Sequence, residues 1–552
     1  MKAFRTALTS LSLLLVTFSV SVTTIADDGL SVEQARLKAH IDFLASDALL
    51  GRAAGSREFE IAARYVASQF EQLGMRPAGT DGSFFQEVPL VERQLVEGSG
   101  SVTVAKNGQS YALTYGDDFL MSPDGMMETQ SVTAEAVFVG YGIVAPEFGH
   151  DDYADVDVEG KIVVMLTGRP EAWPTEEGAH FASGREKARH AAERGAVGRV
   201  IIATPRTQDV FSWDLYRYYY TLSSMSWVDE AGVPDGYHKV LKGAAVVHSD
   251  KAADMFDGTP MSAQDVFDAD ANGGVMQSFD LPVSFSLSRE SAFERTTSPN
   301  ILAAIPGSDP KLSDEYVVFT AHLDHLGVVE GEDGEDHIYN GALDNAAGVS
   351  MLLETARILS AERDQLRRSV LFLVVTAEEK GLLGAGYFAK QPTVPIDQLV
   401  ANVNLDMPVV LYPFADMVAF GAEHSSLKDV VARAASQAGI ELSPDYAPEQ
   451  GYFTRSDHYK LVQEGVPAVA LDVGFKSKDP SIDGEAIARE FTNAHYHKPS
   501  DEASLPIDYD AAAVFAEINI NIAREICNAD ERPTWNKGDF FGETFGPDRV
   551  AD

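Results

Sequence analysis

The sequence predicts an α/β fold in which a mostly parallel sheet carries helices on both faces. Two observations from about residue 298 onward support this prediction. Short runs bounded by polar segments are mainly apolar along their whole length, and they alternate with segments of helical periodicity. Strands that are apolar throughout are typical of a parallel sheet buried on both faces.

Four apolar runs are the expected strands of this sheet. Each run is built mainly from Val, Leu, Phe and Ala and is followed by a polar segment. Runs of this length match strands better than helices. They are residues 316–321, 370–375, 399–405 and 466–471.

Two segments are expected to form helices that pack on the sheet, residues 345–359 and residues 35–73. Apolar residues spaced three and four positions apart share one face of a helix. Because the second segment lies far ahead of the strands in sequence, the stretch between them is interpreted as an insertion. The residues with this spacing are Val349, Leu352, Leu353 and Ala356 in the first segment, and Ile61, Tyr65, Val66 and Phe70 in the second.

The proposed insertion, residues 134–283, differs in character from its surroundings. It contains short strand signals, turn residues and aromatic patches, with a helical pattern around residues 187–194. We therefore expect a β-rich α/β domain inserted in a main domain. The main domain comprises residues 27–133 and 284–530, and an irregular tail follows at residues 531–552.

Residues 1–26 are typical of a signal peptide. Lys2 and Arg5 give a positive start, residues 11–22 are mostly apolar, and small residues precede the expected cleavage point after Ala26. The protein is therefore expected to be exported, to the periplasm or the medium. The apolar run is too short and too polar for a membrane span, and no later run is long enough, so no stable membrane insertion is expected.

Composition excludes several classes of protein. The chain has 552 residues, of which 45% are hydrophobic and 23% charged, as in soluble globular proteins. A formal net charge of −41 disfavours binding to nucleic acid or anionic membranes. The single cysteine, Cys527, cannot form an intramolecular disulfide, so stability has to come from the core or from bound metal.

Five short polar motifs lie at or just beyond the ends of expected strands and helices. In a parallel α/β sheet, the carboxyl ends of the strands are where sites form. Taken alone, each motif has an ordinary explanation, such as a surface loop, a helix cap or a solvated acidic turn. Together they supply two His, three carboxylates and one additional Glu. The motifs are residues 321–325, 343–348, 376–381, 402–407 and 496–501.

These residue types suit a site for two divalent cations. In extended backbone His322 and Asp324 project to the same side, so Asp324 could hold the imidazole while its other nitrogen binds metal. Asp344 has two carboxylate oxygens and could bridge two ions. Adjacent Glu378 and Glu379 repel each other, which a cation would offset if one were a ligand and the other a general base. His and carboxylate ligands without Cys suit Zn²⁺, with Mn²⁺ or Co²⁺ as alternatives.

In order and spacing, the five motifs resemble those of the two-zinc aminopeptidase and glutamate carboxypeptidase family, metallopeptidase family twenty-eight. The resemblance implies a fold of the zinc-peptidase type and two Zn²⁺ ions. It implies that His322 and Asp406 bind one ion, that Glu379 and His497 bind the other, and that Asp344 bridges both.

The same resemblance implies the catalytic roles. Glu378 would be the general base, Asp324 would orient His322, and Tyr496 would either donate to the oxyanion or only pack beside a ligand. The implied reaction is hydrolysis of the N-terminal peptide bond of peptides that have a free N-terminus, by a water that bridges the metals.

The insertion resembles a protease-associated domain through residues 138–143, 155–161 and 195–198. Such a domain is usually non-catalytic. The segment with Arg455, Asp457 and His458 also resembles a family segment near the substrate, but the sequence assigns it no role.

Three alternatives remain open at this point: a carboxypeptidase, a glutaminyl cyclase, and a non-catalytic binding protein of this fold. The preferred N-terminal residue and the oligomeric state are equally open.

Overall fold

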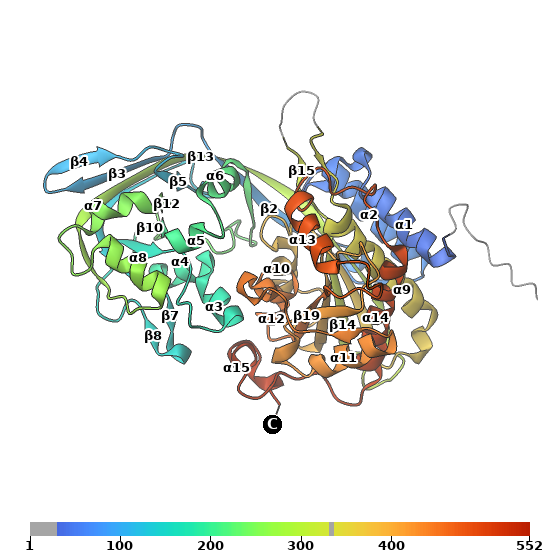
Figure 1. Ribbon diagram of the computed structural model, residues 1–552. Coiled ribbons are helices and arrows are strands. Elements are labelled where there is room, and N and C mark those ends of the chain that lie inside the picture. The colour runs from blue at the N-terminus through green and yellow to red at the C-terminus, as the bar shows by residue number, and fades with distance from the viewer. Residues whose placement is uncertain (1–29, 330–335, 552) are drawn as a thin grey trace, which may run out of the picture.

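The computed structural model describes residues 30–329 and 336–551. These residues form two main sheets, each covered by its own helices and joined by one long strand, β13 (Phe279–Ile305) (Figure 1). The predicted signal peptide, residues 1–26, lies outside the described residues. No helix among the described residues combines the length and the apolar character that crossing a bilayer requires.

The main sheet has the predicted strands at its centre. In the described chain, β17 (Ser369–Val375), β14 (Tyr316–His322), β18 (Leu399–Leu405) and β21 (Ala468–Val473) lie side by side in that order and run parallel. The next strand on each side, β13 and β19 (Asp416–Phe420), is antiparallel, so the whole sheet is mixed. The outer strands are β2 (Phe85–Leu95), β11 (Ser224–Trp227), β1 (Arg76–Pro77) and β20 (Glu441–Leu442).

Helices cover both faces of this sheet, as predicted, because alternate strand residues point to opposite sides. Val317 and Phe319 of β14 pack in the large core, whereas Val318 packs in the smaller one. The large core lies under α1 (Val32–Leu44), α2 (Arg57–Gln72), α9 (Gly348–Ala361), α11 (Leu427–Gln437) and α14 (Tyr509–Asn528). The smaller core lies under α10 (Leu383–Lys390) and α12 (His458–Val462).

The early helical segment differs from its prediction in detail. It is split into α1, a 3₁₀ turn η1 (Asp47–Arg52) and α2. Val66 and Phe70 of the expected stripe are fully buried, but Ile61 is 41% exposed. The buried stripe is completed by Phe59, Ala62 and Ala63 instead, and the two small alanines let the helix approach the sheet closely.

The inserted unit is built on the second sheet, in the order β4–β3–β13–β6–β9–β10–β12–β5. This sheet begins at β3, ahead of residue 134, and extends along β13 to Glu290. The strands are β3 (Ser101–Lys106), β4 (Gln109–Ala112), β5 (Phe119–Met121), β6 (Thr129–Phe138), β9 (Ile162–Leu166), β10 (Gly198–Ala203) and β12 (Ala244–His248).

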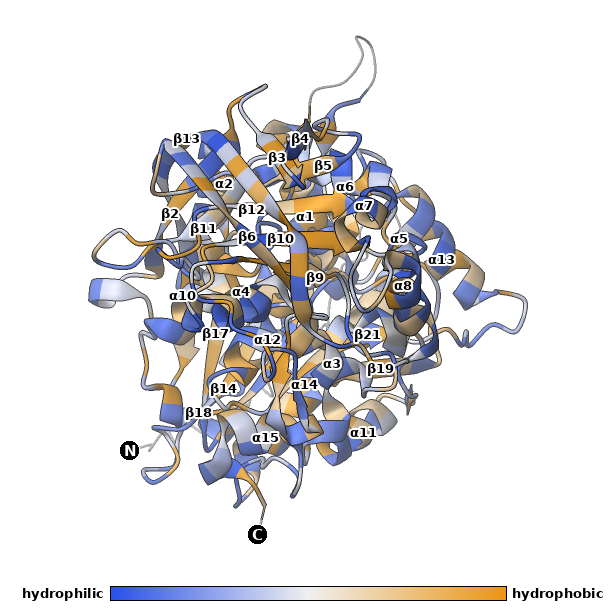
Figure 2. Cartoon of the chain, turned by 90° about the vertical axis from the view of Figure 1, so that its left-hand side faces the viewer, coloured by the Kyte–Doolittle hydropathy of each residue, from blue (hydrophilic) through white to orange (hydrophobic). Residues whose placement is uncertain are grey.

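β13 connects the two units as a continuous strand of 27 residues. Its first part pairs with β6, its middle with β2 and its last residues with β17. Buried and more exposed residues alternate along the first part, and the end is buried throughout, in agreement with the mixed colouring of β13 in Figure 2. One side of the strand therefore faces solvent until it enters the main core.

The C-terminal tail, expected to be irregular, is ordered and packed. Trp535 is fully buried, and a short helix α15 (Phe540–Phe545) follows it. The tail joins the two units, since His424 of the main domain contacts both Asp539 of the tail and Glu176 of α3 (Thr175–Ala182) in the inserted unit. Burial of its aromatic side chains stabilises such a segment even where it has no regular structure.

We expect this three-residue contact to stabilise the fold in a pH-dependent way. Burial alone lowers the pKa of His424, but Asp539 and Glu176 outweigh burial and raise the pKa to about 10. Its contribution to stability is then complete below the unfolded pKa of about 6.5 and is lost as pH rises through about 10. The melting temperature of His424→Gln should therefore fall furthest below wild type near about pH 6 and approach it at about pH 11. A difference in melting temperature between His424→Gln and wild type that stays constant over this pH range would contradict the charged contact.

Candidate metal centre

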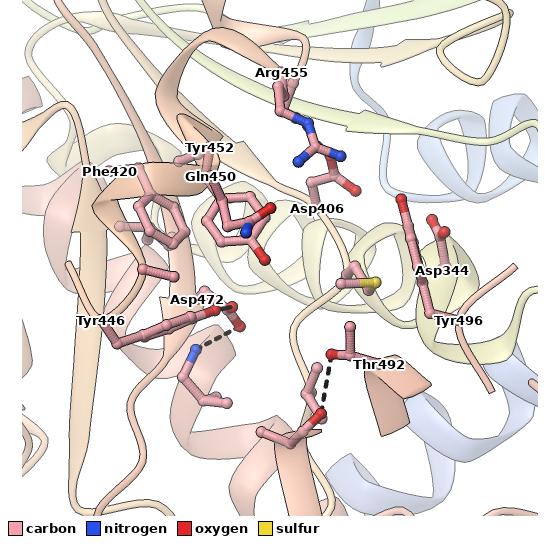
Figure 3. Close-up of a pocket in the computed structure, with 18 of the residues that line it drawn as sticks. Asp344, Asp406, Phe420, Tyr446, Gln450, Tyr452, Arg455, Asp472, Thr492 and Tyr496 are labelled. Carbon is pink, nitrogen blue, oxygen red and sulfur yellow. Dashed lines mark hydrogen bonds between the residues drawn. The ribbon is translucent and has the colours of Figure 1, made fainter. Parts of the chain in front are cut away.

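Parallel strands bring the predicted residues to one edge of the main sheet. His322 ends β14, Glu378 and Glu379 follow β17, and Asp406 follows β18. Asp344 lies in the turn ahead of α9, and its peptide bond to Asn345 is cis. His497 lies in the loop after α13 (Gly484–Ala494). Of these side chains, those of Asp344, Glu378, Asp406 and His497 line one cavity, and Figure 3 shows Asp344 and Asp406 there.

The first group of side chains gathers around His322. Its Nε2 atom lies 2.9 Å from Asp406 Oδ1 and 3.2 Å from Asp344 Oδ1. The His322 side chain is 1% exposed and that of Asp344 is 5% exposed. An imidazole nitrogen and two carboxylate oxygens at these separations are spaced as ligands of one ion with bonds of about 2.0–2.2 Å would be.

The second group gathers around the other oxygen of Asp344. His497 Nε2 lies 3.3 Å from Asp344 Oδ2 and 3.1 Å from Glu379 Oε2. On the far side of Glu379, His325 Nδ1 lies 2.7 Å from Oε1. Asp344 thus turns one oxygen toward each group, as a carboxylate that bridges two ions must.

The residues present fit a pair of divalent cations. Among the described residues, two sets of ligand atoms lie within 4.8 Å of one another, His322 with Asp344 and Asp406, and His325 with Asp344 and Glu379. Glu379 Oε1 makes no hydrogen bond although it is buried. Three carboxylates held this close repel one another unless cations lie between them. The donor set of imidazole and carboxylate, without thiolate, is one that Zn²⁺ accepts.

The adjacent glutamates have opposite electrostatic environments. Burial, with Asp406 and Glu379 nearby, raises the pKa of Glu378 well above its usual range despite the opposing effect of His322. Burial also acts to raise the pKa of Glu379, but His497 and His325 outweigh it and bring the value to about 2. Neighbouring acids whose pKa values are driven apart are typical of a division between a proton carrier and a fixed charge.

Several residues around the centre have unusual backbone conformations. Ala377 immediately before Glu378, Met407 immediately after Asp406, and His497 itself have φ between 49° and 53°. Residues other than glycine rarely adopt this left-handed region, and where they do, they cluster at functional sites. The strand ends therefore turn sharply to aim these side chains at the centre.

Asp324 takes a different position from the one predicted for its carboxylate. His322 Nδ1 lies 3.1 Å from the main-chain oxygen of Asp324, not from its side chain. The carboxylate instead accepts hydrogen bonds from the backbone amides of Glu378 (3.0 Å) and Glu379 (3.3 Å). Asp324 thus fixes the imidazole through its carbonyl and the glutamate turn through its carboxylate. Burial raises the pKa of that carboxyl to about 6.

The remaining predicted residues lie at the wall of the centre. The Tyr496 ring stacks on His497 with ring centroids 3.9 Å apart, and it lines the cavity beside Asp344 (Figure 3). Arg455 is exposed, lies 5.6 Å from the centroid of the Tyr452 ring and also lines the cavity. Asp457 and His458 are fully buried.

Some supporting residues were not predicted from the sequence. Asp501 accepts hydrogen bonds from the amides of Leu343 (2.9 Å) and Asp344 (3.0 Å), so it holds the turn that carries Asp344. Ser456 donates to Asp406 Oδ2 and receives a hydrogen bond from Asn404. Both Asp501 and Ser456 lie within polar segments noted in the sequence, but spacing alone does not distinguish such partners from loop residues.

Arg52 supports the centre from its buried side. Its guanidinium donates only to main-chain carbonyls, those of Leu44, Leu323, Asn340 and Gly341, and the residue is 1% exposed. It therefore ties the loop that carries Asp324 to the loop that leads to Asp344. No sequence motif indicated this role.

The cavity beside the centre has a volume of about 400 Å³. Its far wall is aromatic, with Tyr446 stacked on Phe475 at 4.2 Å between ring centroids and Phe420 close by. At its floor, the Tyr446 hydroxyl donates to Asp472 over 2.7 Å (Figure 3). Asp344, Asp406 and Glu378 form the opposite wall, so a group bound in the cavity reaches the metal centre.

Comparisons with known proteins give family matches for two parts of the chain. Residues 300–523 match the model of Peptidase family M28, and residues 129–221 match that of the PA domain. A probable zinc metalloprotease of Leptosphaeria maculans is 35% identical over 92 residues, which are 16% of this chain and 20% of that protein. A probable leucine aminopeptidase 2 of Aspergillus fumigatus is 26% identical over 231 residues, 40% of this chain and 42% of that protein.

The fold also has a counterpart among solved structures. An aminopeptidase from Aneurinibacillus sp. strain AM-1 superposes with a TM-score of 0.50 at 19% identity, covering 90% of this chain and 93% of that one. The chain matches less than half the length of the curated relatives described above. Residues 300–523 therefore carry a peptidase domain of family M28, and the PA domain at residues 129–221 lies between the N-terminal helices α1 and α2 and the strands that bear the candidate metal centre.

Proposed function

We propose that this protein is an exported two-zinc aminopeptidase that hydrolyses the N-terminal peptide bond of peptides. The observation that carries the proposal is the shared carboxylate of Asp344, which faces His322 and Asp406 with one oxygen and His497 and Glu379 with the other. The similarity to proteins named as a zinc metalloprotease and an aminopeptidase supports the choice of metal and reaction.

The proposed ligands are divided between the two ions. His322 and Asp406 would hold one ion and His497 and Glu379 the other, with Asp344 common to both. When bound, such an ion pair supplies Lewis-acid polarisation of the scissile carbonyl and lowers the pKa of water from about 15.7 toward about 7.

The residues of the chain carry the proton. Glu378 lines the cavity beside Asp344 and Asp406 and takes a proton from the attacking water as the new C–O bond forms. It then delivers that proton to the leaving amine nitrogen as the C–N bond breaks. Burial keeps the pKa of Tyr496 well above its usual range, so its hydroxyl stays protonated and can donate to the carbonyl oxygen as negative charge develops there.

Charge favours an aminopeptidase over a carboxypeptidase. Of the carboxylates that line the cavity, Asp472 belongs neither to the proposed metal ligands nor to the proton transfer, so its charge is available to attract a free amino group. A carboxypeptidase would need cations to bind the terminal carboxylate of its substrate, and the arginines that line the cavity supply few of them. Arg489 is paired with Glu485 at 2.8 Å, and Arg455 is exposed over the Tyr452 ring.

We expect the cavity to select bulky apolar N-terminal residues. Its aromatic wall of Phe420, Tyr446 and Phe475 offers apolar area to a large side chain, and Asp472 at the floor repels an acidic one. The kcat/KM for leucyl and phenylalanyl arylamides should exceed that for glycyl and glutamyl arylamides by at least about 10-fold. Steady-state rates on this panel check the prediction, and glutamyl arylamide as the best substrate would contradict it.

One experiment separates the proposed function from its alternatives. Purified protein is loaded with zinc, its metal content is measured, and arylamides, N-terminally blocked peptides and glutaminyl peptides are assayed with and without a chelator. Two ions per chain with chelator-sensitive arylamide cleavage support the proposal. Cleavage of only blocked peptides would indicate a carboxypeptidase, and cyclisation of glutaminyl peptides a cyclase. No turnover with metal bound would indicate a binding protein.

Export is part of the proposal and rests on residues 1–26. A positive start at Lys2 and Arg5, followed by an apolar run and Ala26, is the pattern that export machinery reads. Sequencing the amino terminus of the protein from its native host checks this, and an intact Met1 would contradict it.

A further inference from the structure

His325 is a buried imidazole at the metal centre with no role in the ligand set proposed above. It follows Asp324 in the loop after β14, and its side chain is fully buried. Nδ1 lies 2.7 Å from Glu379 Oε1 and 3.9 Å from Asp344 Oδ2. Neither of its ring nitrogens makes a hydrogen bond among the described residues, and Glu379 Oε1 makes none either. Burying a polar ring costs free energy unless another group makes a polar contact with it.

Glu379 lies between two imidazoles that face different oxygens. His497 Nε2 is 3.1 Å from Oε2, on the side of Asp344, and His325 Nδ1 is 2.7 Å from Oε1, on the other side. The two rings lie 5.8 Å apart between centroids at 69°. Contact with both imidazoles fixes the rotation of the carboxylate, because turning it would separate one oxygen from its neighbour.

The distances around His325 distinguish a positioning role from a ligand role. Oxygen and nitrogen ligands of one tetrahedral zinc ion are separated by about 3.3 Å, given bonds of about 2.0 Å. His497 meets this value at 3.1 and 3.3 Å to Glu379 and Asp344. His325 does not, since its Nδ1 lies 2.7 Å from Glu379, closer than two ligands of one ion, and 3.9 Å from Asp344, farther than two ligands of one ion.

The surrounding backbone fixes the His325 ring. The amide of His325 donates to the carbonyl of Arg52 over 3.3 Å. Gly341 has φ of +59°, and a Cβ there would lie 2.7 Å from the imidazole carbons. The loop that leads to Asp344 therefore packs flat against the ring, and only glycine allows this approach. A ring held on these sides cannot swing toward another partner.

We propose that His325 is a positioning residue, whose Nδ1 contact with Glu379 Oε1 fixes this oxygen and so directs Oε2 toward the ion shared with Asp344 and His497. The inference rests on the two-ion site proposed above. Groups that orient a metal-bound carboxylate in this way typically change metal affinity by about 10–100-fold when they are removed.

Two substitutions of similar polarity test the role of His325, because they place a side-chain amide nitrogen at different positions of the original ring. His325→Asn puts its amide nitrogen near the position of Nδ1, whereas His325→Gln puts it near that of Nε2. His180→Gln is the matched control. His180 lies in α3 of the inserted unit and is also buried, but its Nδ1 contacts the hydroxyl of Tyr459 over 2.8 Å. Thermal melts of all variants show whether each one folds.

The readout is zinc binding to metal-free protein by calorimetry, together with X-ray absorption of the zinc-loaded protein. We expect His325→Gln to lower the affinity for one of the two ions by about 10–100-fold. The affinities of His325→Asn and His180→Gln should stay near those of wild type. The number of imidazoles around zinc should not change in any variant. Unchanged affinities in His325→Gln, or equal loss in His325→Asn, would overturn the positioning role.

Two further outcomes separate this inference from the proposed function. Loss of one imidazole from the zinc coordination in His325→Gln would make His325 a ligand and overturn its positioning role while leaving the two-ion site intact. Wild-type protein that binds fewer than two ions would overturn the two-ion site itself, and the role of His325 with it.

Discussion

Glu378→Gln is expected to lower kcat by about 10²–10⁴-fold while both ions stay bound. Glutamine keeps the size of the side chain but has no oxygen basic enough to take the proton of water. Glu378 also lies outside both groups of closely spaced ligand atoms, so its loss should not release metal. Metal content and steady-state arylamide kinetics on the same preparation measure both effects, and KM should change little.

Asp344→Asn is the variant to compare with Glu378→Gln, since both replace a carboxylate by an amide. An amide has one acceptor oxygen where the carboxylate has two, so it cannot face both His322 and His497. This variant should therefore lose at least one ion as well as turnover. Near-normal hydrolysis by Glu378→Gln would refute the base assignment, and two tightly bound ions in Asp344→Asn would refute the bridge.

Arg52→Met is expected to destabilise the main domain by about 3–5 kcal/mol, even without metal. Methionine fills much of the volume but donates nothing, so the carbonyls of Leu323, Asn340 and Gly341 lose their buried donor. Each buried acceptor left unpaired costs about 1–3 kcal/mol. Such a loss is a large part of the total stability of an ordinary domain.

Urea denaturation of metal-free protein measures this effect apart from metal binding. Arg52→Lys is the informative comparison, because an ammonium keeps the charge but cannot reach carbonyls in several directions as the planar guanidinium does. It should fall between wild type and Arg52→Met. A free energy of unfolding for Arg52→Met within about 1 kcal/mol of wild type would show that the carbonyls find other donors.

The parallel strands and the residues at their ends could be predicted because each carries a local signal. Residues 399–405 were predicted as a strand from composition alone, and the structure gives the same bounds. His322 and Asp406 each follow an apolar run, and parallel strands bring such ends to one edge whatever the connecting segments do. Knowledge of the strand direction was therefore enough to predict that these residues converge.

Other features depend on contacts between residues far apart in the chain, so local patterns gave no sign of them. Asp324 was expected to hold His322 by its carboxylate, but the backbone amides of the glutamate turn compete for that group. His325 was noted only as part of a motif, since its role depends on which oxygen of Glu379 faces it. The tail was expected to be irregular because part of what buries Trp535, including Val462 and Gly465, lies far from the tail in the chain.

The fold class, the insertion and the set of acids and imidazoles that can hold metal could be predicted, since strand composition and residue chemistry are local properties of the chain. Which oxygen of Asp344 and Glu379 faces which imidazole, and which buried donors hold the loops in place, became known from the folded molecule. These features depend on separations of a few tenths of an ångström between residues distant in the chain, and such separations are fixed only when the core is packed.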